Sequence, residues 1–134
     1  MLNVQIVDDE PIIRLGLQKL INWEEMGFEI TCIAQNGKQA LEQLETEEVD
    51  LIITDIEMPI MNGLDFIKEV REKDKHVEIV ILTAYEDFEY AKTAIRYGIT
   101  QYILKPIEEK AVMQLLLQIR QEIEERAKRK HRLI

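Results

Sequence analysis

The 134-residue chain is 46% hydrophobic and 32% charged, a composition that indicates one folded domain and excludes an intrinsically disordered segment. Its apolar runs are too short to span a membrane, and we expect no signal peptide. The net charge of −9 divides into −11 over residues 1–106 and +2 over residues 107–134, which argues against nonspecific nucleic-acid binding by the acidic part.

Five short runs rich in valine and isoleucine alternate with five segments of helical periodicity. In chain order, we expect strands at 2–7, 28–34, 50–55, 77–83 and 100–105, and helices at 11–21, 37–48, 63–72, 86–97 and 107–130. Pro11 suits the first turn of its helix, and Gly98 suits the end of the fourth. The helical pattern of residues 11–21 is carried by Ile12, Leu15, Leu17 and Leu20.

Two residues in the first third of the chain are expected to serve packing alone. Trp23, in the long connection between the first helix and the second strand, is interpreted as a packing anchor rather than a ligand contact. Cys32 lies in an apolar stretch and is expected in the core. Because it is the only cysteine, an internal disulfide is excluded, and a reducing cytoplasm fits the chain.

Alternation of strand and helix predicts an α/β domain, a (βα)5 doubly wound fold whose five-stranded parallel sheet is covered by helices on both faces. Ligands of such sheets bind outside the carboxyl ends of the strands. The residues expected at that edge are Asp8, Asp9, Asp55, Thr83 and Lys105. Although they lie up to 97 positions apart in the sequence, a parallel sheet would bring them together.

The chemistry of this set is specific, although each member has an ordinary alternative. Asp9 or Thr83 could cap a helix, and Lys105 could be a surface charge. Together, however, three carboxylates can all stay ionised only if a cation joins them, and an all-oxygen site suits Mg²⁺. One carboxylate could then attack phosphorus, while Lys105 and Thr83 contact the phosphoryl oxygens. The set therefore predicts an acyl-phosphate site with Mg²⁺.

Glu10 directly follows the two aspartates, so it could belong to the same site. We expect instead that its side chain points into solvent near the start of the first helix, where a negative charge suits the helix dipole. On this interpretation, two of the three consecutive acids are metal ligands and the third has no role in the site.

The motifs "IVDDEP", "DLIITDIEMPIMNGLDF", "VILTAYEDFEYA" and "YILKP" resemble those of the receiver domain of two-component response regulators. The resemblance spans residues 1–125 and implies a flavodoxin-like fold with strand order 2-1-3-4-5. It implies that Asp55 is the phosphoacceptor, phosphorylated by a sensor histidine kinase. It also implies that Mg²⁺ is bound by Asp8, Asp9, Asp55 and the backbone carbonyl of Glu57.

The resemblance further implies how phosphorylation is transmitted. Thr83 and Lys105 would contact the phosphoryl group, Tyr102 would be the switch aromatic, and the Lys105–Pro106 peptide bond would be cis. The face formed by the fourth helix, the fifth strand and the fifth helix would then repack and favour a homodimer. Its expected residues are Tyr90, Ala94, Tyr97 and Tyr102.

The segments "LINWEEMGFEI" and "TAYEDFEYAKTAIRYGITQYILKP" resemble receivers joined to AraC-type DNA-binding domains. Residues 126–134, which include the basic run "RAKRKHR", are interpreted as a helix end or linker toward such a domain, which these 134 residues do not contain. We therefore expect a transcriptional switch rather than an enzyme. Two alternatives stay open: a stand-alone receiver that acts on a protein target, and a Mg²⁺-dependent phosphatase that works through an aspartyl phosphate.

Overall fold

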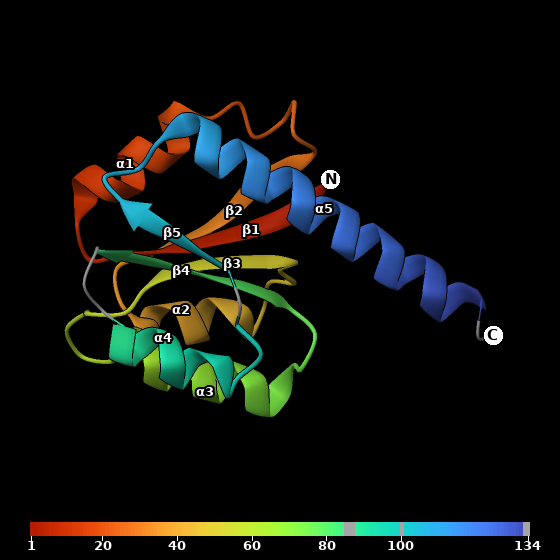
Figure 1. The fold of residues 1–134 in the computed structure, drawn as a ribbon. Coiled ribbons are helices and arrows are strands. Elements are labelled where there is room, and N and C mark those ends of the chain that lie inside the picture. The colour runs from red at the N-terminus through yellow and green to blue at the C-terminus, as the bar shows by residue number, and fades with distance from the viewer. Residues whose placement is uncertain (85–87, 100, 133–134) are drawn as a thin grey trace.

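The computed structural model describes residues 1–84, 88–99 and 101–132, without the side chains of residues 88, 90, 91, 131 and 132. Five parallel strands form one sheet in the order β2-β1-β3-β4-β5, which confirms the predicted fold (Figure 1). The strands are β1 (Leu2–Val7), β2 (Phe28–Ala34), β3 (Leu51–Asp55), β4 (Glu78–Ala84) and β5 (Gln101–Lys105). The helices are α1 (Pro11–Leu20), α2 (Gly37–Leu44), α3 (Gly63–Lys73), α4 (Phe88–Ile95) and α5 (Glu109–Arg132).

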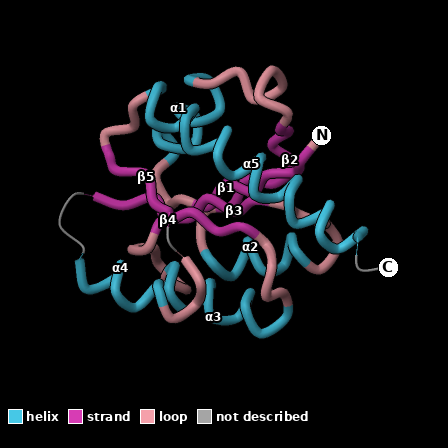
Figure 2. The backbone as a smooth tube through the Cα atoms, turned by 45° about the vertical axis from the view of Figure 1, so that its right-hand side comes forward, coloured by secondary structure: helices cyan, strands magenta, loops and turns pink. Residues whose placement is uncertain are grey.

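The helices cover the sheet from both sides. Helices α1 and α5 lie on one face, and α2, α3 and α4 lie on the other (Figures 1 and 2). Each face has its own core, because successive side chains of a strand point to opposite sides. Thus Ile6 and Ile53 pack toward α1 and α5, whereas Val7 and Ile52 pack toward α2 and α3. None of the described helices is long and apolar enough to cross a membrane.

Local signals explain where two of the helices begin. The Asn36 side chain accepts a hydrogen bond from the Gln39 N–H at 2.8 Å, and Asn62 does the same for Asp65 at 2.9 Å. Helix α2 ends at Leu44 rather than at residue 48, which corrects the expected boundary. The amide of Thr46 bonds to the carbonyl three residues back, so the last turn tightens before the chain enters β3.

Helix α1 buries less of its apolar surface than its sequence pattern suggests. Leu17 is fully buried, but Ile12 and Leu15 are 76% and 50% exposed. Only the face with Ile13 and Leu17, one turn apart, meets the core, because the sheet and α5 cover a single side of the helix. The pattern predicted the helix, and Ile12 and Leu15 leave apolar surface exposed on it.

Three smaller predictions are confirmed. Trp23 is 6% exposed, donates its indole N–H to the Leu17 carbonyl at 2.9 Å, and packs edge-to-face on Phe28. Cys32 is buried in the core. Gly98, after α4, has a φ of +76°, a conformation that side chains with a Cβ rarely adopt.

Two arginines hold the loop of residues 74–77 at the amino edge of the sheet. Arg71 of α3 donates to the carbonyls of Val77 at 2.7 Å, Asp74 at 3.3 Å and Tyr97, beyond the end of α4, at 2.8 Å. Arg126 of α5 donates to the His76 carbonyl at 2.6 Å and forms an ion pair with Glu78. The loop therefore joins α3, α4 and α5, while the basic end of α5 continues past the sheet (Figure 1).

Candidate functional site

At the carboxyl edge of the sheet, the structure brings together the acidic residues predicted there. Asp8 and Asp9 follow β1, and Asp55 ends β3, its immediate neighbour. One carboxylate oxygen from each of Asp8, Asp9, Glu10 and Asp55 lies within 4.8 Å of the others. Asp8 and Asp55 are buried, with exposures of 0% and 7%, whereas Asp9 and Glu10 lie nearer the surface. The four acids form a compact cluster, which we call the acidic cluster.

Lys105, at the end of β5, reaches across to this cluster. Its Nζ lies 3.2 Å from Asp8 Oδ2, 3.3 Å from Asp55 Oδ2 and 3.7 Å from Glu10 Oε1. The Lys105 side chain is only 16% exposed, so its charge acts in a partly desolvated place. The peptide bond between Lys105 and Pro106 is cis, as the sequence resemblance implies.

The backbone around Asp55 fixes the direction of its carboxylate. Asp55 Oδ1 accepts a hydrogen bond from the N–H of Ile56 at 2.7 Å, which leaves Oδ2 facing Lys105. The Gly63 N–H, at the start of α3, donates to the Ile56 carbonyl at 2.7 Å. A Cβ on Gly63 would lie 2.1 Å from the Asp55 carbonyl oxygen, so only glycine allows α3 to begin this close to Asp55.

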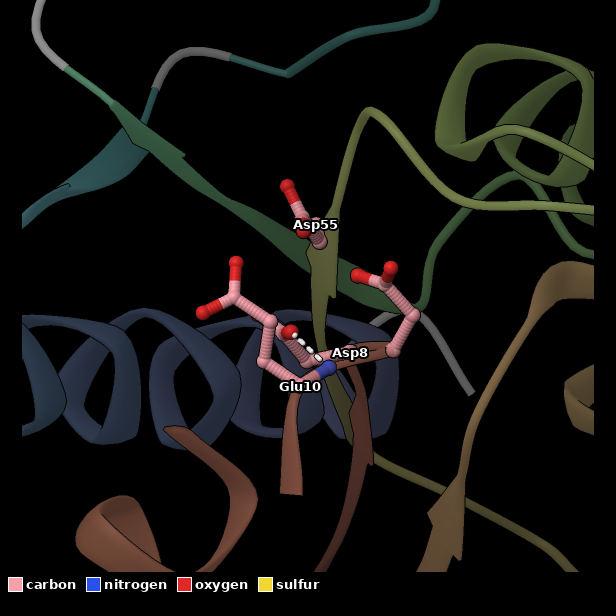
Figure 3. Close-up of side chains that lie close together, drawn as sticks. Asp8, Glu10 and Asp55 are labelled. Atoms are coloured by element: carbon pink, nitrogen blue, oxygen red, sulfur yellow. Dashed lines mark hydrogen bonds between the residues drawn. The ribbon is translucent and has the colours of Figure 1, made fainter. Parts of the chain in front are cut away.

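Glu10 does not point away from the site, contrary to the expectation from sequence. Figure 3 shows Asp8, Glu10 and Asp55 close together, and Glu10 belongs to both the acidic cluster and the ion pairs of Lys105. Pro11 disfavours a helical conformation at the residue before it, and Glu10 is extended, with φ −91° and ψ 115°. Its N–H donates to Asp8 Oδ1 at 2.8 Å, which turns the chain back over the site.

The two buried aspartates of the site and Lys105 have shifted pKa values. Burial, and then the charge of Asp8, raise the pKa of Asp55 to about 6, although Lys105 opposes this shift. Burial likewise raises the pKa of Asp8. Burial alone would lower the pKa of Lys105, but the charges of Asp55 and Asp8 raise it. Ionising both buried aspartates is therefore costly with Lys105 as their nearest cation.

The surroundings of one oxygen atom, Asp8 Oδ2, indicate whether a metal ion fits the site. Among the described residues, Asp8 Oδ2 has no hydrogen-bond donor with acceptable geometry, although it is fully buried and lies within ion-pair distance of Lys105. Buried carboxylate oxygens are normally satisfied. The other oxygen, Oδ1, already accepts from the Glu10 N–H, so Oδ2 is the oxygen that faces Lys105 between Asp55 and Glu10. A cluster of carboxylates around such an atom suits a hard divalent cation such as Mg²⁺.

Comparison with known families decides the identity of the fold. Residues 4–117 match the family described as the response regulator receiver domain. The chain is a receiver domain. The resemblance of its motifs to this family, noted from the sequence, is thereby confirmed.

The curated relatives of this receiver domain are transcriptional regulators. It is 38% identical to the transcriptional regulatory protein YesN of Bacillus subtilis over 119 residues, which are 89% of the chain and 32% of YesN. It is 40% identical to the transcriptional regulatory protein HptR of Staphylococcus aureus over 108 residues, which are 81% of the chain and 42% of HptR. The matched residues thus span about a third to two fifths of the length of these relatives.

Solved structures show the same fold. The REC domain of AraT, a response regulator from Geobacillus stearothermophilus, superposes with a TM-score of 0.89 at 35% identity, covering 94% of this chain and 98% of that one. A two-component transcriptional regulator AraC from Clostridium phytofermentans gives a TM-score of 0.85 at 30% identity, with 93% and 97% covered. A CheX–CheY–BeF3–Mg complex from Borrelia burgdorferi gives 0.79 at 26% identity, with 88% of each chain covered.

The receiver domain's β3–α3 loop forms one wall of the site entrance. Glu57 is exposed and lines a shallow hollow of about 410 Å³ together with Asp9 and Asn62. Further along the loop, Ile60 has a φ of +71°, and the Met61 N–H donates to the Pro59 carbonyl at 2.7 Å. This is a γ-turn of the rare type with positive φ, which is strained for a β-branched residue.

Thr83 lies near the end of β4, and Tyr102 lies on β5, three residues before Lys105. Thr83 donates its hydroxyl to the Ala84 carbonyl at 3.0 Å, and β4 pairs in register with β5 so that Ala84 is opposite Lys105. Tyr102 is 54% exposed, so its ring is accessible on the outer strand of the sheet. In the register of the sheet, Thr83 is one position from the pair that contains Lys105, and Tyr102 is three positions away. The role of both residues in switching stays a prediction.

The residues predicted for the dimer face differ in exposure. Ala94 is 1% exposed in the core beneath α4, so its prediction as a surface residue was wrong: it lies on the inward side of the helix. Tyr97 is partly buried against the same core, and the side chain of Tyr90 lies outside the described residues. Of the four, Tyr102 is the one whose side chain the structure shows as exposed.

Two contributors to the site were missed from the sequence. One is Glu10, for which the following proline was the available signal. The other is Arg14, whose guanidinium donates to the Asp8 carbonyl at 2.7 Å and so fixes the backbone that carries the buried aspartate. An arginine one turn into a helix carries no sequence signal for such a contact.

Proposed function

We propose that this receiver domain is a phosphorylation-activated switch of a two-component system, with Asp55 as the residue phosphorylated by a sensor histidine kinase. The observation that carries the proposal is the position of Asp55: its Oδ2 lies at the carboxyl edge beside a buried aspartate and 3.3 Å from the ammonium of Lys105. Phosphoryl transfer depends mainly on positioning and on neutralising charge, and these groups supply both.

In the proposed transfer, a carboxylate oxygen of Asp55 attacks the phosphorus of a phosphohistidine. The oxygen–phosphorus bond forms as the phosphorus–nitrogen bond breaks, and the imidazole leaves with its electron pair. Lys105 then balances the charge of the phosphoryl oxygens, and the Thr83 hydroxyl donates a hydrogen bond to them. The hydrogen bond from Ile56 to Oδ1 keeps the carboxylate in the orientation that exposes Oδ2.

We further propose that Mg²⁺ binds to the carboxylates of Asp8, Asp9 and Asp55 and to the backbone carbonyl of Glu57. When bound, the ion would neutralise the carboxylates and the incoming phosphoryl group. Two observations support this: the buried, unsatisfied Asp8 Oδ2, and the presence of Mg²⁺ and BeF3 in the structure of the related Borrelia burgdorferi CheY complex.

Phosphorylation would alter the face formed by α4, β5 and α5 and favour a homodimer through it. On this face, the exposed side chains of Tyr102 and Leu104 border a groove of about 570 Å³ between β5 and α5. Exposed apolar surface of this kind is typical of a protein–protein interface, which supports the proposed dimer. If Asp55→Asn and protein treated with BeF3 and Mg²⁺ dimerise equally, the proposed link between phosphorylation and dimerisation is wrong.

The output is proposed to be regulation of transcription in the cytoplasm. The relatives YesN and HptR are transcriptional regulators longer than this chain, so DNA binding would come from a further domain attached after the basic residues 126–134. We propose residues 1–125 as the receiver unit and the remainder as its connection. On this proposal, the chain itself accepts a phosphoryl group and is not an enzyme with an external substrate.

Incubation with acetyl phosphate and Mg²⁺ tests the proposal. We expect mass spectrometry to show one added phosphoryl group per chain, and none in Asp55→Asn, because the nucleophilic oxygen is lost. Glu24→Gln, which removes a charge at the opposite edge of the sheet, should be phosphorylated like the wild type. Continuous release of phosphate without a stable adduct would favour a phosphatase instead.

A further inference from the structure

Lys105 Nζ marks the point on which the carboxylates of the site converge. The three acids around it are Asp8, Asp55 and Glu10, at 3.2, 3.3 and 3.7 Å. Two of these are the buried aspartates proposed to bind Mg²⁺. The third, Glu10, was not expected to take part, yet it faces the same positive charge.

Glu10 also satisfies the distance requirement for sharing a cation with the aspartates. One of its oxygens lies within 4.8 Å of an oxygen of Asp8, Asp9 and Asp55, a span comparable with that of oxygens on opposite sides of one divalent ion, roughly 4–5 Å. The buried Asp8 Oδ2, which lacks a hydrogen bond among the described residues, and Glu10 Oε1 face the same Lys105 ammonium, at 3.2 and 3.7 Å. A cation that satisfies this oxygen is therefore also close to Glu10.

We infer that Glu10 is a fourth acidic group of the divalent-cation site and strengthens cation binding directly, through its own negative charge or through a cation-bound water. The inference rests on the proposed Mg²⁺ site and adds a residue to it. It predicts that the negative charge of Glu10 attracts the ion whether or not Lys105 is present.

The backbone of Glu10 holds its side chain over the site without using the carboxylate. Its N–H donates to Asp8 Oδ1, and Pro11 disfavours a helical conformation at residue 10. Although Glu10 occupies the N-cap position of α1, its side chain makes no capping hydrogen bond. Replacing the carboxylate by an amide therefore removes the charge and leaves the start of α1 intact.

The test is a double-mutant cycle of Glu10→Gln and Lys105→Met, with Mg²⁺ affinity measured by NMR titration at low ionic strength. Removing one negative charge about 5 Å from a divalent ion should weaken Mg²⁺ binding about five-fold, because more than half of the Glu10 side chain is exposed and water screens it. The same loss is expected in the Lys105→Met background. Glu24→Gln, with an equal change of charge at the opposite edge, should bind Mg²⁺ like the wild type.

Two results would overturn the inference. If Glu10→Gln binds Mg²⁺ as tightly as Glu24→Gln, Glu10 lies outside the cation site. If the loss disappears in Lys105→Met, Glu10 acts on the lysine and not on the cation. Both differ from failure of the proposed function, in which the wild type itself would not bind Mg²⁺. Unfolding midpoints in EDTA check the fold, and Glu10→Gln should unfold no earlier than the wild type.

Discussion

The carboxyl edge of the sheet and its amino edge differ in how far their charged side chains are paired with partners. At the carboxyl edge, four acidic side chains lie within 4.8 Å of one another, and three of them form ion pairs with Lys105. A buried oxygen of Asp8 lacks a hydrogen-bond donor with acceptable geometry among the described residues. At the amino edge, Arg71 and Arg126 each donate to backbone carbonyls, and Arg126 also pairs with Glu78. In the first arrangement, four acidic groups share one lysine, so negative charge is in excess. In the second, each arginine has its own acceptors.

This difference separates a site from a structural contact. Uncompensated charge destabilises the fold, and it persists where a ligand is meant to supply the missing partner. Satisfied charge needs no ligand and stabilises the fold directly. Removing a charged group should therefore have opposite effects on stability at the two edges. Three predictions test this difference and a fourth tests backbone strain at the carboxyl edge, in order of decreasing effect.

The largest effect is expected at the amino edge. Arg71→Met should lower the free energy of unfolding by about 2–4 kcal/mol, because three carbonyls lose a charged donor in a partly buried place. Urea denaturation measures the change. Arg129→Met, on the exposed end of α5, is the matched control and should stay within about 0.5 kcal/mol of the wild type. An equal loss in both variants would refute the structural role of Arg71.

At the carboxyl edge, the sign should reverse. Asp55→Asn should raise the free energy of unfolding by roughly 1–3 kcal/mol at pH 7.5 without divalent cations, because it removes a buried charge whose pKa is raised to about 6. Urea denaturation in EDTA measures it, and added Mg²⁺ should narrow the difference by stabilising the wild type. A destabilised Asp55→Asn would show that the acidic cluster is fully compensated by Lys105.

The pH dependence of the unfolding free energy also tests whether the ionised Asp55 carboxylate destabilises the fold. A carboxyl group with a raised pKa binds more protons in the folded state, so its contribution to stability is lost as pH rises from about 4 to above 6. The difference in unfolding free energy between wild type and Asp55→Asn should therefore grow across that interval in EDTA. Saturating Mg²⁺ should flatten this dependence, because the ion competes with the proton. A difference that does not vary with pH would contradict the raised pKa.

The smallest effect concerns backbone strain in the β3–α3 loop. Ile60→Gly should stabilise the domain by about 0.5–1 kcal/mol, because glycine tolerates the positive φ and the isoleucine side chain is 77% exposed. Ile60→Val, which keeps the branched Cβ, should show no gain. Thermal unfolding of the two variants decides the matter, and equal midpoints would mean that the γ-turn is unstrained.

Much of the fold and site could be predicted from sequence because local patterns carry them. Hydrophobic runs of strand length predicted the five strands. Because a parallel sheet brings the carboxyl ends of its strands together, it places Asp8, Asp55 and Lys105 on one edge. The buried side of α1 was predicted less well, because its apolar residues extend around the helix and pattern alone does not say which of them meets the sheet. Ala94 was misplaced for the same reason.

Other features depend on contacts that sequence does not encode locally. The inward position of Glu10 follows from a hydrogen bond to Asp8 and from the proline after it, which together override the simpler expectation of a solvated helix start. The contacts of Arg71 and Arg126 join segments that lie up to 50 residues apart. Such pairings appear only once the helices are docked on the sheet.

The loop of residues 74–77 has a consequence for proteolysis. Lys73 and Lys75 are exposed and are sites that trypsin recognises. However, the N–H groups of His76 and Val77 donate to the Asp74 side chain, and the loop carbonyls accept from the two arginines. A protease must first unfold this segment to bind it in extended form. The loop should therefore resist trypsin although its lysines are exposed. A trypsin cut there would report that α3 and α5 have separated from the sheet.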